Sequence, residues 1–515
     1  MSTVTQPTEA ALRSGRATRA GLRGRWIDEW DPENEPFWEQ TGKRIARKNL
    51  IFSILAEHLG FCIWVLWTIV VINLANVGIK LSVPELFWLT AIPNLIGSGL
   101  RIPYTFAIAR FGGRLWTTIS VSLLLIPALL LAILVPSGWL HHQSHGDQLL
   151  ILTLCAAVAG VGGGNFSSSM ANISFFYPER RKGLALGLNA AGGNLGVAVT
   201  QLLVPLAIIV GIPAVAVKLP IHHVHLAYAG LMWIPFIVVV ALCAWLYMDS
   251  LSQAKTDTEA YGLAVRNPQT WIMSLLYIGT FGSFIGYSFA LPLVIKNTFP
   301  EFLAQHAFIA TYLAGLGFLG ALVGSLARPI GGWLSDRTGG ARVTLASFLG
   351  MAAFTGLAIA GVEHRSFTVF FGAFLAIFAL SGIGNGSTYR MIPSIFAALG
   401  RAHAEANGID PEHTKLDFKR QAAAVIGIAG SIGAFGGFLI QVVFRQSSLH
   451  VAALVKAAKL PAEKVAVAHA HAAWSVGALW VFLAAYVLGA GLTWCFYMRT
   501  RVAVDRVPSL AYASV

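Results

Sequence analysis

Two arginines lie inside long apolar stretches of the chain, Arg101 in GSGLRIPYTF and Arg328 in GSLARPIGGW. Each is followed eleven residues later by a Gly-Gly pair and then by another arginine, Arg114 or Arg342. Placing a guanidinium at the depth of a bilayer costs roughly 2.5–3.5 kcal/mol. Because the chain bears this cost twice, at matching positions, we predict that the two guanidinium groups face each other and bind a small oxyanion.

A carboxylate and an imidazole also lie inside the first apolar stretch, Glu57 and His58 in AEHLGFCIW. Glu57 precedes Phe61 by one helical turn, so it could point toward the arginines and take up a proton as the anion enters. Charge would then stay balanced, which favours coupling of the anion to protons. Two alternatives remain: the pair Glu57–His58 is bonded internally or to Arg390, or it contacts water near the cytoplasmic end.

The elements that hold these residues are predicted to be membrane-spanning helices, because 56% of the 515 residues are hydrophobic and 11% are charged. No soluble globular domain of this size has such a composition. Apolar runs of about 20 residues are long enough to cross a bilayer as helices. We therefore predict an all-α membrane protein with twelve transmembrane helices, at 50–76, 83–108, 115–136, 148–175, 183–210, 225–247, 269–296, 308–334, 343–363, 367–396, 421–444 and 473–497.

A polar linker near the middle of the chain divides these helices into two pseudo-symmetric halves of six. Lys and Arg residues concentrate in the two tails and in the loops on one side of the membrane. By the positive-inside rule, both termini lie in the cytoplasm. The predicted organisation is a basic tail at 1–49, a first half at 50–248, the linker at 249–268, a second half at 269–497 and a tail at 498–515.

The first tail is basic and carries tryptophans near its end. The arginines between Arg13 and Arg25 are typical of a segment that touches anionic lipid, and we prefer this to nucleic-acid binding. The segment from Trp26 to Trp38 is predicted to be an amphipathic element or one that lies at the lipid interface. We see no cleaved signal peptide. The four cysteines lie in predicted spans without CxxC spacing, so we expect no disulfide, metal site or cofactor.

Glycine-rich segments recur at matching places in the two halves, GVGGGNFSSSM at 160–170 and GIGNGSTYRM at 382–391. Small residues let helices approach closely, and this is the main interpretation of these glycines. The compatible functional interpretation is that a ligand reaches the main chain there. A further motif, GGWLSDRTGGAR at 331–342, is predicted to latch helix ends. The signature and gating candidates are Gly162, Gly163, Gly164, Asn165, Gly384, Asn385, Gly386, Asp336 and Arg337.

The segment at 159–196, AGVGGGNFSSSMANISFFYPERRKGLALGLNAAGGNLG, resembles the nitrate signature of the NarK-like nitrate/nitrite porter family of the major facilitator superfamily. GIGNGSTYRMIPSIF at 382–396 is similar to its second copy, and GLRIPYTFAIARFGGRLWT at 99–117 also matches. The likeness covers nearly the whole chain. It implies a major facilitator fold with one anion site between the halves, in a bacterial-type inner membrane.

The same resemblance implies roles for particular residues. Arg101 and Arg328 would grip the planar anion, and Phe61 and Phe281 would sandwich it. Tyr277 and Asn189 would reach its remaining oxygens, and Ser431 would line the same cavity. In many relatives apolar residues stand at the positions of Glu57 and His58, so a role for these two in proton coupling rests on their chemistry alone.

Other classes of protein fit the residues less well. A membrane redox enzyme would need facing axial histidines or cysteine ligands, and His58 is the only histidine well inside a predicted span. A channel would need selectivity rings, and a receptor would need a soluble output domain. We therefore predict a monomeric transporter, not an enzyme, that carries nitrate and nitrite. Proton symport is favoured, anion exchange is the alternative, and an organic acid is the main rival substrate.

Overall fold

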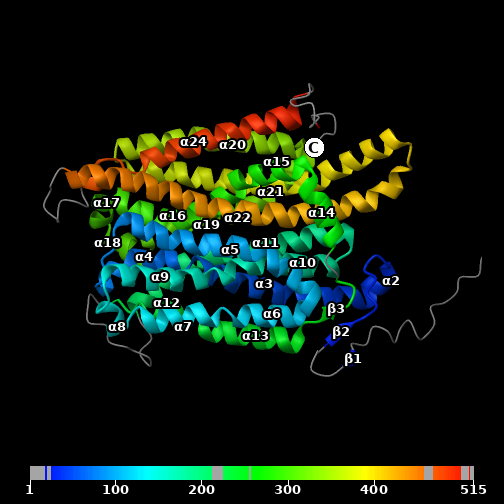
Figure 1. Cartoon of the computed structure of the whole chain (residues 1–515), viewed down its shortest axis with the longest axis horizontal. Helices are drawn as coiled ribbons and strands as arrows, with labels where there is room; N and C mark the ends of the chain where they lie inside the picture. The colour runs from blue at the N-terminus through cyan, green and yellow to red at the C-terminus, as the bar shows by residue number, and fades with distance from the viewer. Residues whose placement is uncertain are drawn as a thin grey trace, which may run out of the picture.

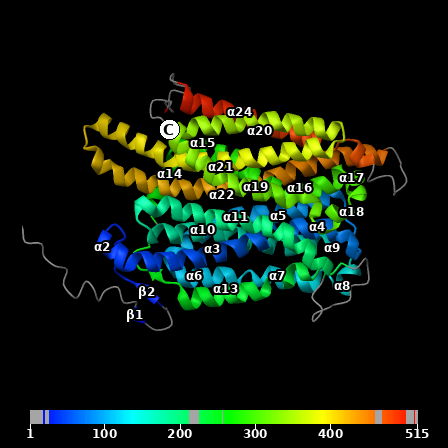
Figure 2. The same cartoon turned by 180° about the vertical axis from the view of Figure 1, so that it is seen from behind.

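The structure is a computed structural model that describes residues 18–19, 25–210, 224–254, 257–457, 468–499 and 510, without the side chains of 411–413. It is a bundle of long helices that run nearly parallel to one axis (Figures 1 and 2). Eleven of the described helical stretches are long and apolar enough to cross a membrane. The helical, membrane-spanning fold expected from composition is therefore confirmed.

The helices before the linker form one layer of the bundle (Figure 1). They are α3 (Lys43–Val65) with α4 (Trp67–Asn73), α5 (Val83–Phe111), α6 (Gly113–Ser122) with α7 (Leu125–Leu134), α9 (His145–Ala159) with α10 (Val161–Phe176), α11 (Glu179–Val210), and α12 (Tyr228–Leu231) with α13 (Ile234–Tyr247).

The helices after the linker form the other layer, and α5 and α11 of the first layer pack against α22 and α19 of the second. They are α15 (Pro268–Tyr277) with the π-helix η5 (Ile278–Gly282) and α16 (Ser283–Thr298), α19 (Gly317–Thr338), α20 (Gly340–Glu363), α21 (Phe367–Asn407), α22 (Pro411–Ala457), and α24 (Val476–Thr493) with η7 (Trp494–Met498).

The predicted second span, α5, is not among the eleven apolar helices, although it is a continuous helix of 29 residues. It begins at a capping box between Ser82 and Glu85. Polar residues such as Asn94 and Arg101 lie buried along it and make it less apolar than its neighbours. With α5, all twelve predicted spans correspond to helices. The buried polar residues of α5 make it a candidate to carry part of a functional site.

Helices α21 and α22 are much longer than the predicted spans at 367–396 and 421–444, with 41 and 47 residues. At 1.5 Å per residue each exceeds about 60 Å, roughly twice the hydrocarbon thickness. Their joined ends project from the bundle as a hairpin (Figure 1, yellow and orange). The sequence from Arg401 to Gln421 is too polar for a hydropathy profile to register, but it contains no proline apart from Pro411 and continues the helices.

At one end of the bundle, here called the linker end, the first tail pairs with the linker. Strand β2 (Arg25–Ile27) pairs antiparallel with β1 (Thr18–Arg19) and parallel with β3 (Ser250–Leu251). Trp30 and Trp38 are buried there against Phe176 and Leu251. The lipid-interface prediction for 26–38 is therefore wrong for these two tryptophans, because the linker gives them an apolar protein surface to cover.

Contacts between the two layers close the linker end as well. Lys419 of α22 forms an ion pair with Glu179 of α11 at 3.1 Å. Helix α14 (Thr258–Arg266) in the linker places the ring of Tyr261 5.1 Å from that of Phe106. The hydrogen bond from Arg420 lowers the pKa of Asp257, which caps α14.

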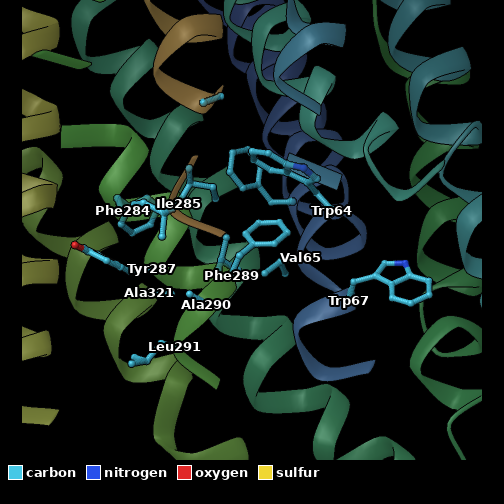
Figure 3. Close-up of a cluster of buried hydrophobic side chains, with 14 of the residues drawn as sticks. Trp64, Val65, Trp67, Phe284, Ile285, Tyr287, Phe289, Ala290, Leu291 and Ala321 are labelled. Atoms are coloured by element: carbon cyan, nitrogen blue, oxygen red, sulfur yellow. The ribbon is translucent and has the colours of Figure 1, made fainter. Parts of the chain in front are cut away.

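On the side of Arg101 away from the linker, α3–α4 packs against α16 through apolar side chains. The rings of Trp64 and Phe289 lie 5.4 Å apart in a T-shaped arrangement, and Figure 3 shows Phe289 beside Val65. Three hydrogen bonds also cross between the layers here: Thr90 to Gln441 (3.0 Å), Gln201 to the Ser288 carbonyl (2.6 Å) and Lys296 to the Ile72 carbonyl.

Candidate functional site

The two intramembrane arginines lie on helices of different layers. Helix α5 carries Arg101 and packs against α22, and α19 carries Arg328 and packs against α11. Arg101 on α5 is fully buried, and Arg328 on α19 is 8% exposed. Arg101 donates from Nε to the Gly163 carbonyl (3.2 Å) and from Nη1 to the Gly430 carbonyl (2.9 Å). These two bonds fix the guanidinium of Arg101 between α10 and α22, one helix from each layer.

One aromatic ring, Phe166, lies under both guanidinium groups. The Cζ atom of Arg101 lies 4.6 Å from its centroid, and that of Arg328 lies 5.9 Å away. Both guanidinium groups therefore lie against the same ring. Phe166 was not among the predicted site residues. Its position directly after Gly164 and Asn165 in the glycine-rich segment was the available signal.

A second set of aromatic side chains comes from the α15–η5 segment. Tyr277 and Phe281 are stacked with centroids 5.4 Å apart, and Phe281 lies 5.0 Å from Cζ of Arg101. The π-helical turn between them brings residues four apart onto one face. Phe61 lies one ring further away, 6.2 Å from Phe166, and neither arginine lies over its ring.

Three polar hydrogen donors in this region are buried and have no partner within the described residues: Nη2 of Arg101, Nη1 of Arg328 and Oη of Tyr277. The charges of both arginines act on Tyr277. A buried donor without a partner is costly and needs an explanation. Two guanidinium forks and one hydroxyl beside stacked rings are suited to a flat, singly charged oxyanion, whose oxygens accept from all three.

Tyr277→Phe is expected to weaken anion binding without destabilising the fold. Its hydroxyl donates to no residue that the structure describes, so the ring can remain in place. Loss of one hydrogen bond to a charged ligand costs about 1.5–3 kcal/mol, or roughly tenfold or more in the KM for nitrate. Uptake kinetics would measure this. In the control, Tyr287→Phe, the bond to Tyr486 (2.6 Å) is lost, so Tm rather than KM should fall. An unchanged KM in Tyr277→Phe would contradict a role for this hydroxyl.

Asn189 lies beside the acid and not beside the arginines. Its Nδ2 atom donates to Oε2 of Glu57 (2.8 Å) and to Oγ of Ser169 (2.6 Å). Glu57 is fully buried, and the charges of both arginines act on its carboxylate. His58 instead bonds to the Gly192 carbonyl through Nδ1 (2.9 Å). Glu57 therefore neither pairs with His58 nor lies exposed at the end of its helix.

The glycines of the repeated segments lie at close helix crossings. A Cβ atom on Gly162 would come within 2.1 Å of the Gly60 carbonyl oxygen, and one on Gly386 within 2.2 Å of the Arg328 carbonyl oxygen. The neighbours Gly163, Gly164 and Gly384 are similarly tight. The amide oxygens of Asn165 and Asn385 are buried without a partner in the described chain. Close packing accounts for these glycines, and it brings the main chain to the arginines.

The remaining candidates lie apart from the arginine pair or only next to it. Asp336 bonds to Arg390 of α21 at 2.5 Å, while the guanidinium of Arg337 lies 4.0 Å from the ring centroid of Trp333. Arg390 is thus paired with Asp336 rather than with Glu57. Ser431 is buried next to Gly430, whose carbonyl holds Arg101. No group of three or more His, Cys, Asp or Glu residues suited to a metal ion occurs in the described ranges.

Comparison with known proteins decides which family has this architecture. The sequence model of the Major Facilitator Superfamily matches residues 50–441. The chain belongs to the major facilitator superfamily. Solved structures of such transporters share its fold: a D-xylose-proton symporter superposes with a TM-score of 0.58 at 15% identity, covering 87% of this chain and 97% of the other. A bacterial homologue of the human lysosomal transporter Spinster gives a TM-score of 0.57 at 16% identity, covering 86% and 95%.

Curated relatives narrow the position within the major facilitator superfamily. The nitrate/nitrite transporter NarU of Salmonella typhimurium is 36% identical, covering 92% of this chain and 96% of its own. NarU of Escherichia coli is 35% identical, covering 95% of this chain and 99% of its own. The probable nitrate/nitrite antiporter NarK2 of Thermus thermophilus is 37% identical, covering 81% of this chain and 88% of its own. These relatives confirm the NarK-like family predicted from the motifs. Because these relatives are named as transporters, the alternative that this chain is a redox enzyme is excluded.

Proposed function

We propose that this facilitator moves nitrate and nitrite across a cell membrane by alternating access, with the anion held between Arg101 and Arg328. The observation that carries the proposal is the set of buried, unpartnered donors on Arg101, Arg328 and Tyr277 among the described residues. Three relatives, two named nitrate/nitrite transporters and one named a probable nitrate/nitrite antiporter, support the same substrate.

Shape and charge together select this substrate. Nitrate is flat and carries one charge, so the guanidinium groups can donate in its plane while Phe281 and Phe166 limit the thickness of the site. Sulfate is tetrahedral rather than flat, so an oxygen outside the plane of the guanidinium groups would collide with a ring. Phe61 and Ser431 line the same region in this proposal.

For coupling we favour nitrate/proton symport, with Glu57 as the proton acceptor. An empty site holds two arginine charges, and an ionised Glu57 offsets one of them. When nitrate binds, protonation of Glu57 keeps the total charge unchanged. The second candidate is nitrate/nitrite exchange, which is favoured by the name of the T. thermophilus relative, a probable antiporter.

The proposed operation uses the two halves, residues 50–248 and 269–497, as bodies that rock around the arginine pair. The linker at 249–268 joins them on the cytoplasmic side, where both tails lie by the positive-inside rule. The proposed location is a bacterial-type inner membrane, and the proposed functional unit is a monomer. The pair Asp336–Arg390 and the residue Arg337 belong to the cytoplasmic gate in this scheme.

The test is nitrate uptake into proteoliposomes under two conditions. One condition imposes an inward proton gradient on vesicles with an anion-free lumen, and the other supplies internal nitrite without a gradient. Glu57→Gln is measured beside the wild type. Glu363→Gln, which changes an exposed carboxylate at the end of α20, is the matched control.

Symport predicts uptake driven by the gradient that Glu57→Gln abolishes and Glu363→Gln preserves. Exchange predicts uptake that needs internal nitrite and is indifferent to Glu57→Gln. If nitrate moves in neither condition, the proposed substrate is wrong.

A further inference from the structure

The carboxylate of Glu57 is built into the protein by a specific arrangement of neighbours. Asn189 donates to its Oε2 atom at 2.8 Å. On the same helix α11, a Cβ atom at Gly193 would come within 2.2 Å of Oε1. A residue other than glycine would therefore push the carboxylate away. Helix α11 thus leaves space for the carboxylate at Gly193 and binds it through Asn189, one turn earlier.

Two buried hydroxyl groups continue from this carboxylate in one direction. Asn189 also donates to Oγ of Ser169 on α10 at 2.6 Å, so one amide group holds this hydroxyl beside the carboxylate of Glu57. This Oγ atom lies 3.1 Å from that of Ser53, and either hydroxyl can donate. Ser53 and Ser169 are 1% and 7% exposed. The chain of polar groups therefore runs from Glu57 through Ser169 to Ser53 without contact with lipid.

The direction of this chain follows from the helix that carries both of its ends. Ser53 precedes Glu57 by four residues on α3, so it lies one turn nearer the start of that helix. One further turn in the same direction stands Asn49, which bonds to Asp249 at the linker end. With the termini in the cytoplasm, the hydroxyl groups lead from the anion site toward the cytoplasm.

We propose that Ser169 and Ser53 are the proton exit of Glu57 toward the cytoplasm, with Asn189 as the residue that positions the carboxylate. This inference rests on the proposed proton coupling. In the step, the protonated carboxyl gives its proton to Oγ of Ser169, and Ser169 gives its own proton to Oγ of Ser53. Ser53 in turn gives its own proton to a water molecule on the cytoplasmic side. Each hydroxyl then ends with one proton, one hydronium ion is formed, and Glu57 is left ionised.

The charged and titratable groups around Glu57 are consistent with release after the anion has left. Arg101 of α5 and Arg328 of α19 both act on its charge, and Glu57 acts on Tyr389 of α21. His58, the neighbour on its own helix, is bonded to a main-chain carbonyl of α11 instead. Once nitrate no longer offsets the arginines, the ionised carboxylate does so, and the hydroxyl groups provide the route for its proton.

The proposal assigns Asn189 a role different from the one implied by family resemblance. In the resemblance it reaches the anion, whereas here both donor contacts go to Glu57 and Ser169. Where an apolar residue stands at position 57, the amide has no acid to hold. The presence of Glu57 therefore accounts for the change of partner.

The test uses the full chain in proteoliposomes, with Ser169→Ala, Ser53→Ala and the double variant. Two rates are measured: nitrate uptake driven by an imposed proton gradient, and counterflow of labelled nitrate with equal nitrate and pH on both sides. Counterflow needs no net release of protons. Ser168→Ala is the matched control, because Ser168 is also buried and its hydroxyl donates to the Asn165 carbonyl (3.2 Å) outside the proposed route. Ser169→Thr and Ser53→Thr keep the hydroxyl.

Each alanine variant is expected to slow gradient-driven uptake by roughly tenfold or more, as for loss of a proton-transfer group. Counterflow should stay within about twofold, and the threonine variants should recover uptake. The double variant should be no slower than the slower single variant, since both residues serve one route.

Three results would overturn the route. The first is normal gradient-driven uptake by Ser169→Ala together with loss of that uptake in Glu57→Gln. In that case Glu57 still couples nitrate to protons, but its proton does not pass through Ser169. The second is equal loss of uptake and counterflow in the alanine variants, which marks a structural role. The third is a threonine variant as slow as alanine in a protein of normal thermal stability. Indifference of uptake to Glu57→Gln would instead overturn the proposed coupling itself.

Discussion

Arg328→Lys is expected to reduce kcat/KM for nitrate uptake by roughly 100-fold, since removing a partner from a buried charged hydrogen bond costs about 3 kcal/mol. Lysine keeps the charge but lacks the planar fork. The side chain of Arg328 makes no hydrogen bond within the described residues, and its Nη1 atom is buried without a partner there. Its replacement should therefore leave the fold intact and remove only contacts to the anion.

Arg101→Lys should be at least as damaging, because the bonds of Arg101 to the Gly163 and Gly430 carbonyls also tie α10 to α22. Arg110→Lys, at the exposed C-terminal end of the same helix, is the matched control and should transport normally. Uptake by proteoliposomes containing equal amounts of each variant measures the effect. If Arg328→Lys retains more than about a third of the wild-type rate, the two-arginine site is wrong.

Gly162→Ala is expected to destabilise the protein strongly or to prevent its accumulation in the membrane. The added methyl group would lie 2.1 Å from the Gly60 carbonyl oxygen, so α3 and α10 must separate. Overpacking of a tight interior costs about 1–3 kcal/mol, and contact with a rigid backbone atom belongs at the upper end. Thermal unfolding and size-exclusion chromatography of the purified protein would measure this.

The control is Gly183→Ala, at a position of α11 where a Cβ atom meets nothing within 4 Å. This variant should match the wild type or be slightly more stable, because alanine favours a helix over glycine by about 1 kcal/mol. Equal stability of Gly162→Ala and Gly183→Ala would mean that the glycine crossing of α3 and α10 is looser than the structure describes.

The helical spans and the placement of Arg101 and Arg328 inside them were predictable from the sequence, because each rests on a local property. The length of an apolar run can be counted in the sequence, and the free energy needed to place an arginine inside that run can be estimated from it. A repeated spacing, such as Arg101 to Gly112 and Arg328 to Gly339, reports internal symmetry without any tertiary contact. The second span was predictable although it is the most polar, because Arg101 was read within it as a functional residue.

The extension of α21 and α22 beyond the membrane and the burial of Trp30 and Trp38 were not predictable in this way. Both depend on which surface a polar or aromatic segment finds after folding. A hydropathy profile treats a polar helix outside the bilayer as a loop. It treats a tryptophan near the membrane as an interface residue, although the linker strand Ser250–Leu251 offers a protein surface.

The sequence by itself therefore determined the class of the fold and the charge and helical position of the two arginines. Only the tertiary structure decided what surrounds them: Phe166 lies under both guanidinium groups, and Asn189 holds Glu57. The physical reason is rotation. Which side chain of a buried helix meets which neighbour depends on the angle of each helix about its own axis, and packing across helices sets that angle. Glu57 and Asn189, 132 residues apart, meet only after that packing is complete.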